Sequence, residues 1–314
     1  MSAPVTVAVV SWNTRELLRG CLRSLTPEID AGRAAVWVVD NGSTDGSREL
    51  VREEFPAITL LEPDQNLGFG PAVNLVAGCT DSEWIAPSNG DVALELGALE
   101  RLLAVGRADP RVGCVAPRLV LPDGSTQHSV YRFPRPLVAL ATHVPLPRSA
   151  GDRFCLLGSW DPERAREVDW AVGAFLLIRR EAWDAAGGFD DSQWMFAEDL
   201  DLGWRLARAG WTRRYEPAAV VKHFESAATV EAFGAERTAR TMEATYAWLR
   251  RRRGRAYASA TASVGVAAMA TQLALYEPLA RLAARRFAPR RDRARFWLSI
   301  HRDGLRPSRR PVRR

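Results

Sequence analysis

Four short apolar runs, each followed by a turn or a helical pattern, constrain the fold of this chain more than any other feature. The first run, Val5–Val10, is continuous and mostly β-branched, which is typical of a strand buried on both faces of a parallel sheet. Further strands are predicted over residues 35–39, 58–61 and 83–87, with a helix between each pair. This βαβαβαβ order predicts an α/β fold with a mostly parallel central sheet flanked by helices.

The predicted helices between these strands have signals of their own. Asn13 is expected to cap the first helix, whose apolar face repeats at helical spacing. That face consists of Leu17, Leu18, Cys21, Leu22 and Leu25. Residues 41–47 are of the types that favour turns and caps, so they predict a loop leading into a second helix. Pro71 fits the first turn of the third helix.

The pattern is less regular after a predicted helix at residues 96–106. Residues 121–125 predict a hairpin turn, and the proline-rich stretch 132–158 predicts a long mobile loop. A buried strand is expected over residues 168–178 and a helix over residues 200–209, closed by Gly210. A last strand, over residues 212–221, leads to His223.

Composition places the chain among ordinary globular proteins. It has 314 residues, of which 47% are hydrophobic and 25% are charged, so it can bury a full core. Its four cysteines form no CxxC pair, which excludes a disulfide framework or a zinc site and predicts a reducing, cytosolic compartment. The N-terminus has no basic segment before its first apolar run, so no signal peptide is expected.

The charge is distributed unevenly along the chain. The net charge is +6, but the segment from Arg250 to Arg314 contains 18 arginines and three acids. The preceding residues are therefore acidic overall, and the basic segment marks a second functional region.

Polar residues follow two of the predicted strands at their carboxyl ends, where ligands bind in open parallel sheets. Asp40 ends the second strand, and Asp91 follows the fourth in a turn containing Asn89. A carboxylate there is able to hold Mg²⁺ or Mn²⁺ against a diphosphate, because hard cations prefer oxygen ligands. The alternative for Asp91 is an ordinary turn residue.

Two further groups suggest chemistry. Glu198, Asp199 and Asp201 stand together at a helix start, where the helix dipole favours negative charge, although capping alone explains such a cluster. His223 is either a metal ligand or a structural hydrogen bonder. The glycines at 68 and 70 lack the third glycine of a dinucleotide fingerprint and do not follow the first strand, which excludes a Rossmann dehydrogenase.

The order of these stretches resembles the family 2 glycosyltransferases of the GT-A fold, and within them the bacterial rhamnosyltransferases that act on polyprenyl-diphosphate-linked sugars. The resemblance covers about residues 4–230. It rests on residues 9–18, 38–46, 66–70, 88–91 and 187–206, followed by His223.

The resemblance implies a role for each candidate residue. Asp199 matches the catalytic base, and Asp91 and His223 match metal ligands; Asn89 stands where the first acid of the DxD-type motif is expected, so one carboxylate holds the metal. Asp40 matches the residue that contacts the donor base or ribose. The remaining donor-site residues are Ser11, Asn13, Arg15, Asn66, Gly68 and Asn89, and the supporting residues are Glu198, Asp201 and Trp204.

This set implies an inverting sugar transfer from a nucleotide diphosphate donor, dTDP-rhamnose being one candidate, to a glycan or lipid-linked acceptor in cell-envelope polysaccharide synthesis. A divalent cation, Mg²⁺ or Mn²⁺, neutralises the departing diphosphate. Asp199, expected to be partly desolvated near Trp194 and Phe196, takes the proton of the acceptor hydroxyl as its oxygen attacks the anomeric carbon.

The basic segment contains 21 residues without a charge, Ala256–Tyr276. That length spans a bilayer, but the run is dominated by Ala, Ser and Thr, which favours a helix lying in the interface of an anionic membrane. A solvated helical appendage is the alternative. Nucleic-acid binding is disfavoured, because the segment has few aromatics for stacking and the rest of the chain is acidic.

Together these features predict a GT-A domain over residues 1–230 and a helical, Arg-rich, membrane-associating region over residues 231–314. The enzyme is expected in the cytoplasm, peripheral on the inner face of the cell membrane. Two other functions stay open: an inactive nucleotide-sugar-binding protein, and a basic interaction module that acts through the tail.

Overall fold

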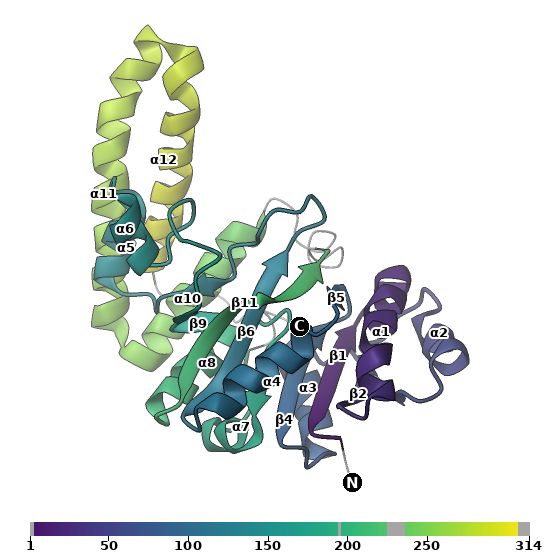
Figure 1. Ribbon diagram of the computed structural model, residues 1–314. Coiled ribbons are helices and arrows are strands. Elements are labelled where there is room, and N and C mark those ends of the chain that lie inside the picture. The colour runs from purple at the N-terminus through teal and green to yellow at the C-terminus, as the bar shows by residue number, and fades with distance from the viewer. Residues whose placement is uncertain (1–2, 194–195, 225–235, 307–314) are drawn as a thin grey trace. The chain divides into compact units, whose positions relative to one another are not determined.

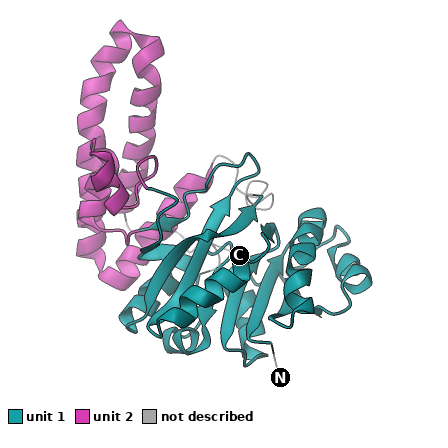
Figure 2. Cartoon of the chain, viewed as in Figure 1, with its two compact units in different colours: residues 1–131, 161–235 teal, residues 132–160, 236–314 magenta. Residues whose placement is uncertain are grey.

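The computed structural model describes residues 3–193, 196–224 and 236–306. Its chain divides into two compact units, shown in Figure 2. Unit 1 comprises residues 1–131 and 161–235, and unit 2 comprises residues 132–160 and 236–314. The boundary expected near residue 230 lies outside the described residues. Residues 132–160, which the sequence pattern assigned to the first domain, group with the C-terminal helices instead.

Unit 1 contains a nine-stranded mixed sheet in the order β3-β2-β1-β4-β10-β6-β11-β5, with β8 paired to β11 (Figure 1). The first four strands of that order are mutually parallel, and β6 and β11 are also parallel. Strand β10 is antiparallel to both of its neighbours. The bounds are β1 Val5–Ser11, β2 Ala34–Asp40, β3 Thr59–Leu61, β4 Trp84–Asn89, β5 Val92–Leu94, β6 Val112–Val120, β8 Arg166–Glu167, β10 Leu177–Arg179 and β11 Thr212–His223. The predicted mostly parallel α/β sheet is therefore confirmed.

Helices cover this sheet where the apolar spacing predicted them. On α1, the residues Leu18, Cys21, Leu22 and Leu25 are fully buried, and they pack with β1 in one hydrophobic core. Burying a leucine in this way contributes about 1.5–3 kcal/mol. The helices of unit 1 are α1 Arg15–Asp30, α2 Ser47–Glu54, α3 Phe69–Gly78, α4 Ala98–Ala108, α7 Arg180–Ala186 and α8 Glu198–Arg208.

Two local predictions in unit 1 are wrong. Asn13 does not cap α1: it has a left-handed backbone with φ of 52°, and Thr14 occupies the cap position without a side-chain hydrogen bond to the amides of the helix. The expected single strand over residues 168–178 is divided. Its first part forms β9 (Trp170–Ala171), which pairs with β7 (Val130–Tyr131) in a separate small sheet, and its last part forms β10. Two different pairing partners break the apolar run.

The regular elements in the described part of unit 2 are all helices. Its elements are α5 Pro136–His143, α6 Arg148–Arg153, α10 Arg237–Arg253, α11 Arg255–Leu282 and α12 Ala284–Leu305. The two long helices, α11 and α12, lie side by side as a hairpin (Figure 1). The mobile loop predicted over residues 132–158 is wrong, because α5 packs on α11 and gains from that partner the apolar contacts that its short sequence lacks.

Candidate active site

The parallel register brings three of the predicted donor residues to one edge of the sheet. Ser11 is paired with Asp40 across β1 and β2, and Val10 is paired with Asn89 across β1 and β4. The chain then turns at Gly90, whose amide donates to the Val10 carbonyl at 2.9 Å. A Cβ at Gly90 would come within 3.3 Å of Ser11, so this close approach favours glycine.

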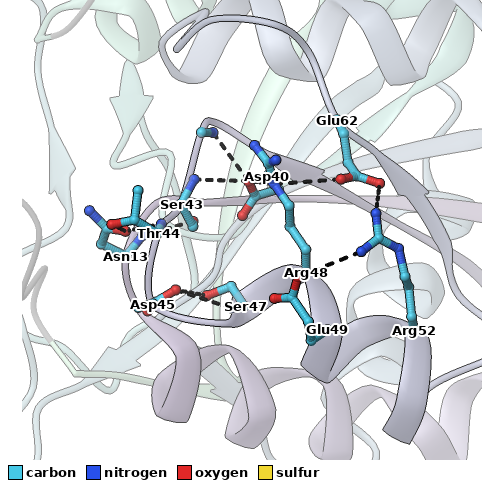
Figure 3. Close-up of polar contacts among 11 residues, drawn as sticks. Asn13, Asp40, Ser43, Thr44, Asp45, Ser47, Arg48, Glu49, Arg52 and Glu62 are labelled. Atoms are coloured by element: carbon cyan, nitrogen blue, oxygen red, sulfur yellow. Dashed lines mark hydrogen bonds and ion pairs between the residues drawn. The ribbon is translucent and has the colours of Figure 1, made fainter.

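Asp40 presents one fixed and one unpartnered carboxylate oxygen. Its Oδ1 accepts hydrogen bonds from the amides of Ser43 at 2.9 Å and Gly42 at 3.2 Å, and from Arg48 Nε at 2.8 Å. Figure 3 shows Arg48 reaching Asp40 from α2, with Glu62 beside it. Asp40 is 1% exposed, and its Oδ2 is buried without a hydrogen-bond partner. The carboxylate is thus held rigidly with one acceptor free.

Asn13 and Arg15 connect the loops that follow β1 and β2. Asn13 Oδ1 accepts from the Thr44 amide at 2.8 Å, and the Asn13 amide donates to Ser43 Oγ at 2.9 Å. The Arg15 amide donates to Asp45 Oδ2 at 2.8 Å. The sequence predicted contact with the donor for these residues. Their described contacts shape the loop around Asp40, as Figure 3 shows for Asn13.

The remaining donor-site residues are also engaged in local contacts. Ser11 Oγ lies 3.0 Å from Thr14 Oγ1. Asn66 Oδ1 accepts from the Gly68 amide at 2.9 Å, and Asn41 Nδ2 donates to the Gly68 carbonyl at 3.2 Å. These bonds hold the loop before α3 next to the end of β2.

The two predicted metal ligands are brought together by a strand pairing. Strand β11 runs antiparallel to β5, so His223 pairs with Val92, and the Phe224 amide donates to the Asp91 carbonyl at 2.9 Å. His223 Nε2 lies 3.4 Å from Asp91 Oδ1, and both residues are buried. Gln127 Oε1 accepts from His223 Nδ1 at 2.8 Å.

This pair has the chemistry of a divalent-cation site. When the ring is neutral and Nδ1 donates to Gln127, the lone pair of His223 lies on Nε2, and that buried atom has no hydrogen-bond partner. It faces a carboxylate oxygen of Asp91, so a nitrogen and an oxygen ligand converge. In the described parts of the chain, no cluster of three or more His, Cys, Asp or Glu side chains is able to hold a metal. Further ligands would have to come from substrate oxygens or water.

Asp199 stands in the first turn of α8. Its Oδ1 accepts from the Leu200 amide at 2.7 Å and its Oδ2 from the Gly173 amide at 3.2 Å. Burial raises the pKa of Asp199, and burial together with the charge of Asp199 raises the pKa of Glu198. A carboxylate with a raised pKa is a stronger base at the pH where it is ionised.

The backbone before this acidic turn is strained. Phe196 and Ala197 both have left-handed conformations, with φ of 62° and 73°, although neither is glycine. Such residues cost of order 1–3 kcal/mol each and concentrate at functional sites. Trp194, which was expected to help desolvate Asp199, lies outside the described residues.

Asp201 and Trp204, which the sequence also predicted to support the site, lie further along α8 than Asp199. Asp201 is fully buried, and Arg205 Nε donates to its Oδ2 at 2.7 Å. Arg205 also donates to the carbonyl of Ala186 at the end of α7, so Asp201 contributes to helix packing. Trp204 is partly buried on the same helix.

Residues 173–175 contact both Asp199 and the end of β4. The Asn89 amide donates to the Ala174 carbonyl at 2.9 Å, and Ser88 pairs with Phe175, while Gly173 holds Asp199. The same three-residue segment therefore forms backbone contacts with the end of β4 and a hydrogen bond with the first turn of α8.

Four residues of this site were not identified from the sequence: Arg48, Asn41, Gln127 and Gly173. Asn41 was within reach of sequence reasoning, because it directly follows Asp40. Gln127 and Gly173 carry no such signal, since Gln127 lies 96 positions from its partner His223 and Gly173 lies 26 positions from Asp199.

Known proteins are similar to this chain in sequence and in fold. Residues 3–259 match the family model described as glycosyltransferase like family 2. The N-acetylglucosaminyl-diphospho-decaprenol L-rhamnosyltransferase of Mycobacterium tuberculosis is 35% identical over 210 residues, covering 62% of this chain and 68% of the relative. The pre-mycofactocin glycosyltransferase of the same organism is 32% identical over 225 residues, covering 70% of this chain and 42% of the relative.

Solved structures confirm the GT-A fold. The mannosyltransferase PcManGT from Pyrobaculum calidifontis, in complex with GDP-Man and Mn²⁺, superposes with a TM-score of 0.61 at 20% identity, covering 97% of this chain and 87% of that one. GalNAc-T7 with UDP, GalNAc and Mn²⁺ gives a TM-score of 0.54 at 14% identity over 70% of this chain and 44% of that one. The family match spans most of the chain, and a named transferase shares a third of the aligned residues. The protein belongs to glycosyltransferase family 2 and is a glycosyltransferase.

Proposed function

We propose that this enzyme transfers rhamnose from dTDP-rhamnose to a polyprenyl-diphosphate-linked acceptor, with inversion and with the help of Mg²⁺ or Mn²⁺. The metal dependence in this proposal rests on the buried Asp91–His223 pair. In this pair His223 Nε2 faces a carboxylate oxygen of Asp91 at 3.4 Å and forms no hydrogen bond. The choice of sugar and acceptor is supported by the 35% identity to an L-rhamnosyltransferase whose name includes a decaprenol-linked sugar.

Asp40 supports a donor base with an imide N–H. Its Oδ2 is buried and accepts no hydrogen bond, while Arg48 and two amides hold its other oxygen. Leaving such an acceptor unpaired costs about 1–3 kcal/mol, so a ligand that donates to it gains affinity. Thymine and uracil carry an N–H of this kind, whereas adenine does not.

Asp91 and His223 are the residues that would hold the cation, and Gln127 orients the imidazole whose Nε2 faces Asp91. A divalent cation bound there offsets the charge on the departing nucleoside diphosphate. The two solved structures named above contain Mn²⁺, which is consistent with this role but does not choose between Mn²⁺ and Mg²⁺.

Asp199 is the proposed base. Its two oxygens are oriented by the amides of Leu200 and Gly173, and its raised pKa increases its basicity. In the reaction the acceptor oxygen forms a bond to the anomeric carbon, the bond from that carbon to the donor phosphate breaks, and Asp199 receives the hydroxyl proton. Attack from the face opposite the leaving group inverts the anomeric centre.

A position on the inner face of the membrane is supported by unit 2. Among the described residues, α11 is the one helix long and apolar enough to cross a membrane, with a mean hydropathy of 1.3, and 28% of its apolar window is buried. Its neighbour α12 carries seven arginines. Each arginine is costly in the hydrocarbon core, so this hairpin fits the interface of an anionic membrane better than a transmembrane position.

The test is a turnover assay with the full chain, Mn²⁺ and a decaprenyl-diphospho-N-acetylglucosamine acceptor. Matched donors are dTDP-rhamnose, UDP-N-acetylglucosamine and GDP-mannose. The proposal predicts acceptor-dependent release of dTDP and a rhamnosylated lipid whose new linkage has the opposite anomeric configuration to the donor. Faster transfer from another donor would refute the assignment of the sugar, and binding without turnover would favour an inactive sugar-nucleotide-binding protein.

A further inference from the structure

A pocket of about 320 Å³ lies within unit 2, and none of its lining residues belongs to the sugar-transfer site. Its walls come from α5 and the residues that follow it, from α11 and from α12. Its lining includes the polar and aromatic side chains of His143, Gln272, Tyr276, Arg290, Arg293 and Trp297. None of the described lining residues is acidic.

The positive charge of this pocket is not neutralised. Three acids follow Arg250 in the chain, and each is paired with an arginine outside the pocket. The pairs are Glu277 with Arg295 at 2.7 Å, Asp292 with Arg291 at 2.8 Å and Asp303 with Arg306 at 3.0 Å. Among the described residues, Arg290 and Arg293 form no ion pair. Two guanidinium groups are therefore free to bind an anion.

The walls of the pocket are tied together by hydrogen bonds. His143 Nε2 on α5 lies 2.8 Å from His301 Nε2 on α12, and Tyr246 of α10 bonds the other ring nitrogen of His301 at 2.7 Å. Gln272 of α11 donates to the His143 carbonyl at 2.6 Å. The His301 ring lies so near Gly265 of α11 that a Cβ there would be 2.6 Å away. The site is preorganised, which lowers the entropic cost of binding.

The histidines do not supply the charge. Burial lowers the pKa of His143, with a further contribution from the nearby charge of Arg293, and burial lowers the pKa of His301 to about 4. Both rings are neutral near pH 7, so the two arginines alone make the pocket cationic.

Aromatic and apolar groups surround the charged part. Arg290 lies over the Tyr276 ring at 6.0 Å, and Trp297 contributes a second amphipathic ring. Leu275 and Phe296, the chain neighbours of these two aromatics, are 56% and 43% exposed. Tyrosine and tryptophan beside exposed apolar side chains are typical of residues at the headgroup level of a membrane.

We propose that this pocket binds the phosphate group of a membrane lipid, with Arg290 and Arg293 contacting the phosphate oxygens. Tyr276 and Trp297 then lie at the boundary between the headgroup and the acyl chains. The site is separate from the residues of sugar transfer, so it adds a specific lipid contact to an enzyme whose chemistry takes place in unit 1.

The test compares two double variants of the full chain in vesicle flotation. Arg290→Gln with Arg293→Gln removes the pocket charges, whereas Arg285→Gln with Arg302→Gln removes two exposed arginines of the same helix that do not line the pocket. Vesicles contain phosphatidylglycerol, or oleate at equal negative charge as a phosphate-free anion. The pocket variant is expected to lose about tenfold or more in affinity for phosphatidylglycerol vesicles, several times more than the control variant.

Equal losses in the two variants, or equal binding of the wild type to oleate vesicles, would overturn the proposal in favour of unspecific electrostatics. A further arm replaces phosphatidylglycerol with polyprenyl diphosphate at the same charge. Tighter, Arg290- and Arg293-dependent binding there assigns the pocket to the diphosphate of the acceptor lipid, and equal binding assigns it to bulk phospholipid. Transfer to a soluble acceptor analogue stays unchanged in the pocket variant, which separates this proposal from that of the sugar-transfer site.

Discussion

His223 Nε2 lies 3.4 Å from Asp91 Oδ1, although the two residues are 132 positions apart in the chain. The antiparallel pairing of β11 with β5 creates this contact, and the amide of Phe224 bonds to the Asp91 carbonyl beside it. A buried imidazole nitrogen without a hydrogen-bond partner next to a carboxylate is an arrangement that a cation stabilises.

Asp91→Ala is expected to abolish the metal dependence of donor binding, because the carboxylate is the one oxygen ligand at this pair. Isothermal titration of dTDP into the variant, with Mn²⁺ and then with EDTA, measures the effect. The wild type serves as the control and should lose affinity when EDTA is added. If the wild type binds dTDP equally well in both conditions, the metal assignment is wrong.

Gln127→Leu tests whether the hydrogen bond to His223 Nδ1 supports metal binding. Removing such an outer partner of a ligand costs about 10–100-fold in metal affinity. The Mn²⁺ concentration that gives half-maximal activity should rise by that factor, and His223→Ala should raise it further, with partial recovery at high Mn²⁺. A lower Tm with an unchanged Mn²⁺ requirement in both variants would assign His223 a purely structural role.

Asp199→Asn keeps the shape of the proposed base and removes its basicity. kcat should fall by about 10²–10⁴ while the Kd for dTDP stays nearly constant. The matched control is Asp201→Asn two residues further on. Because Asp201 is buried against Arg205, that variant should lower the free energy of unfolding by about 1–3 kcal/mol and leave kcat largely intact. The opposite pattern would transfer the role of base to Asp201.

The pH dependence of kcat should report the raised pKa of Asp199. The carboxylate is the active form, so kcat falls as the pH drops through a pKa above the ordinary carboxyl range, about tenfold per pH unit below it. The folded state also holds this proton more tightly than the unfolded chain does, so stability declines as the pH rises through the same window. Asp199→Asn should remove this contribution from the stability profile.

Membrane binding by unit 2 should depend on salt if it is electrostatic. Affinity for anionic vesicles is expected to fall markedly between low salt and about 0.5 M NaCl, because the screening length drops below about 8 Å beyond physiological ionic strength. Neutral vesicles are the control and should bind weakly at every salt concentration. Truncation after Leu249 is a poor alternative test, since it would remove α11 and expose the packed face of α5. Salt-independent binding would point to insertion of α11.

The sequence by itself determined the parallel strands β1 to β4 and the sheet edge at which Asp40 lies. The β-branched run of β1 and the helical spacing of apolar residues in α1 are local patterns that indicate which side chains are buried. The structure confirms the predicted strand and the predicted helix. The position of Asp40 at the end of β2 followed from the same patterns, because a strand that stops at a turn signal leaves its last residue at the sheet edge.

Only the tertiary structure decided which residues touch. Hydrogen bonds join Gln127 to His223, Arg48 to Asp40 and the Gly173 amide to Asp199. No periodic pattern in the sequence predicts any of these three contacts. The same limit explains the wrong predictions: α5 gains its stability from α11, and residues 168–178 divide because their two ends pair with different strands. Local patterns encode which face of an element is buried, whereas its partner is selected by the packing free energy of the whole unit.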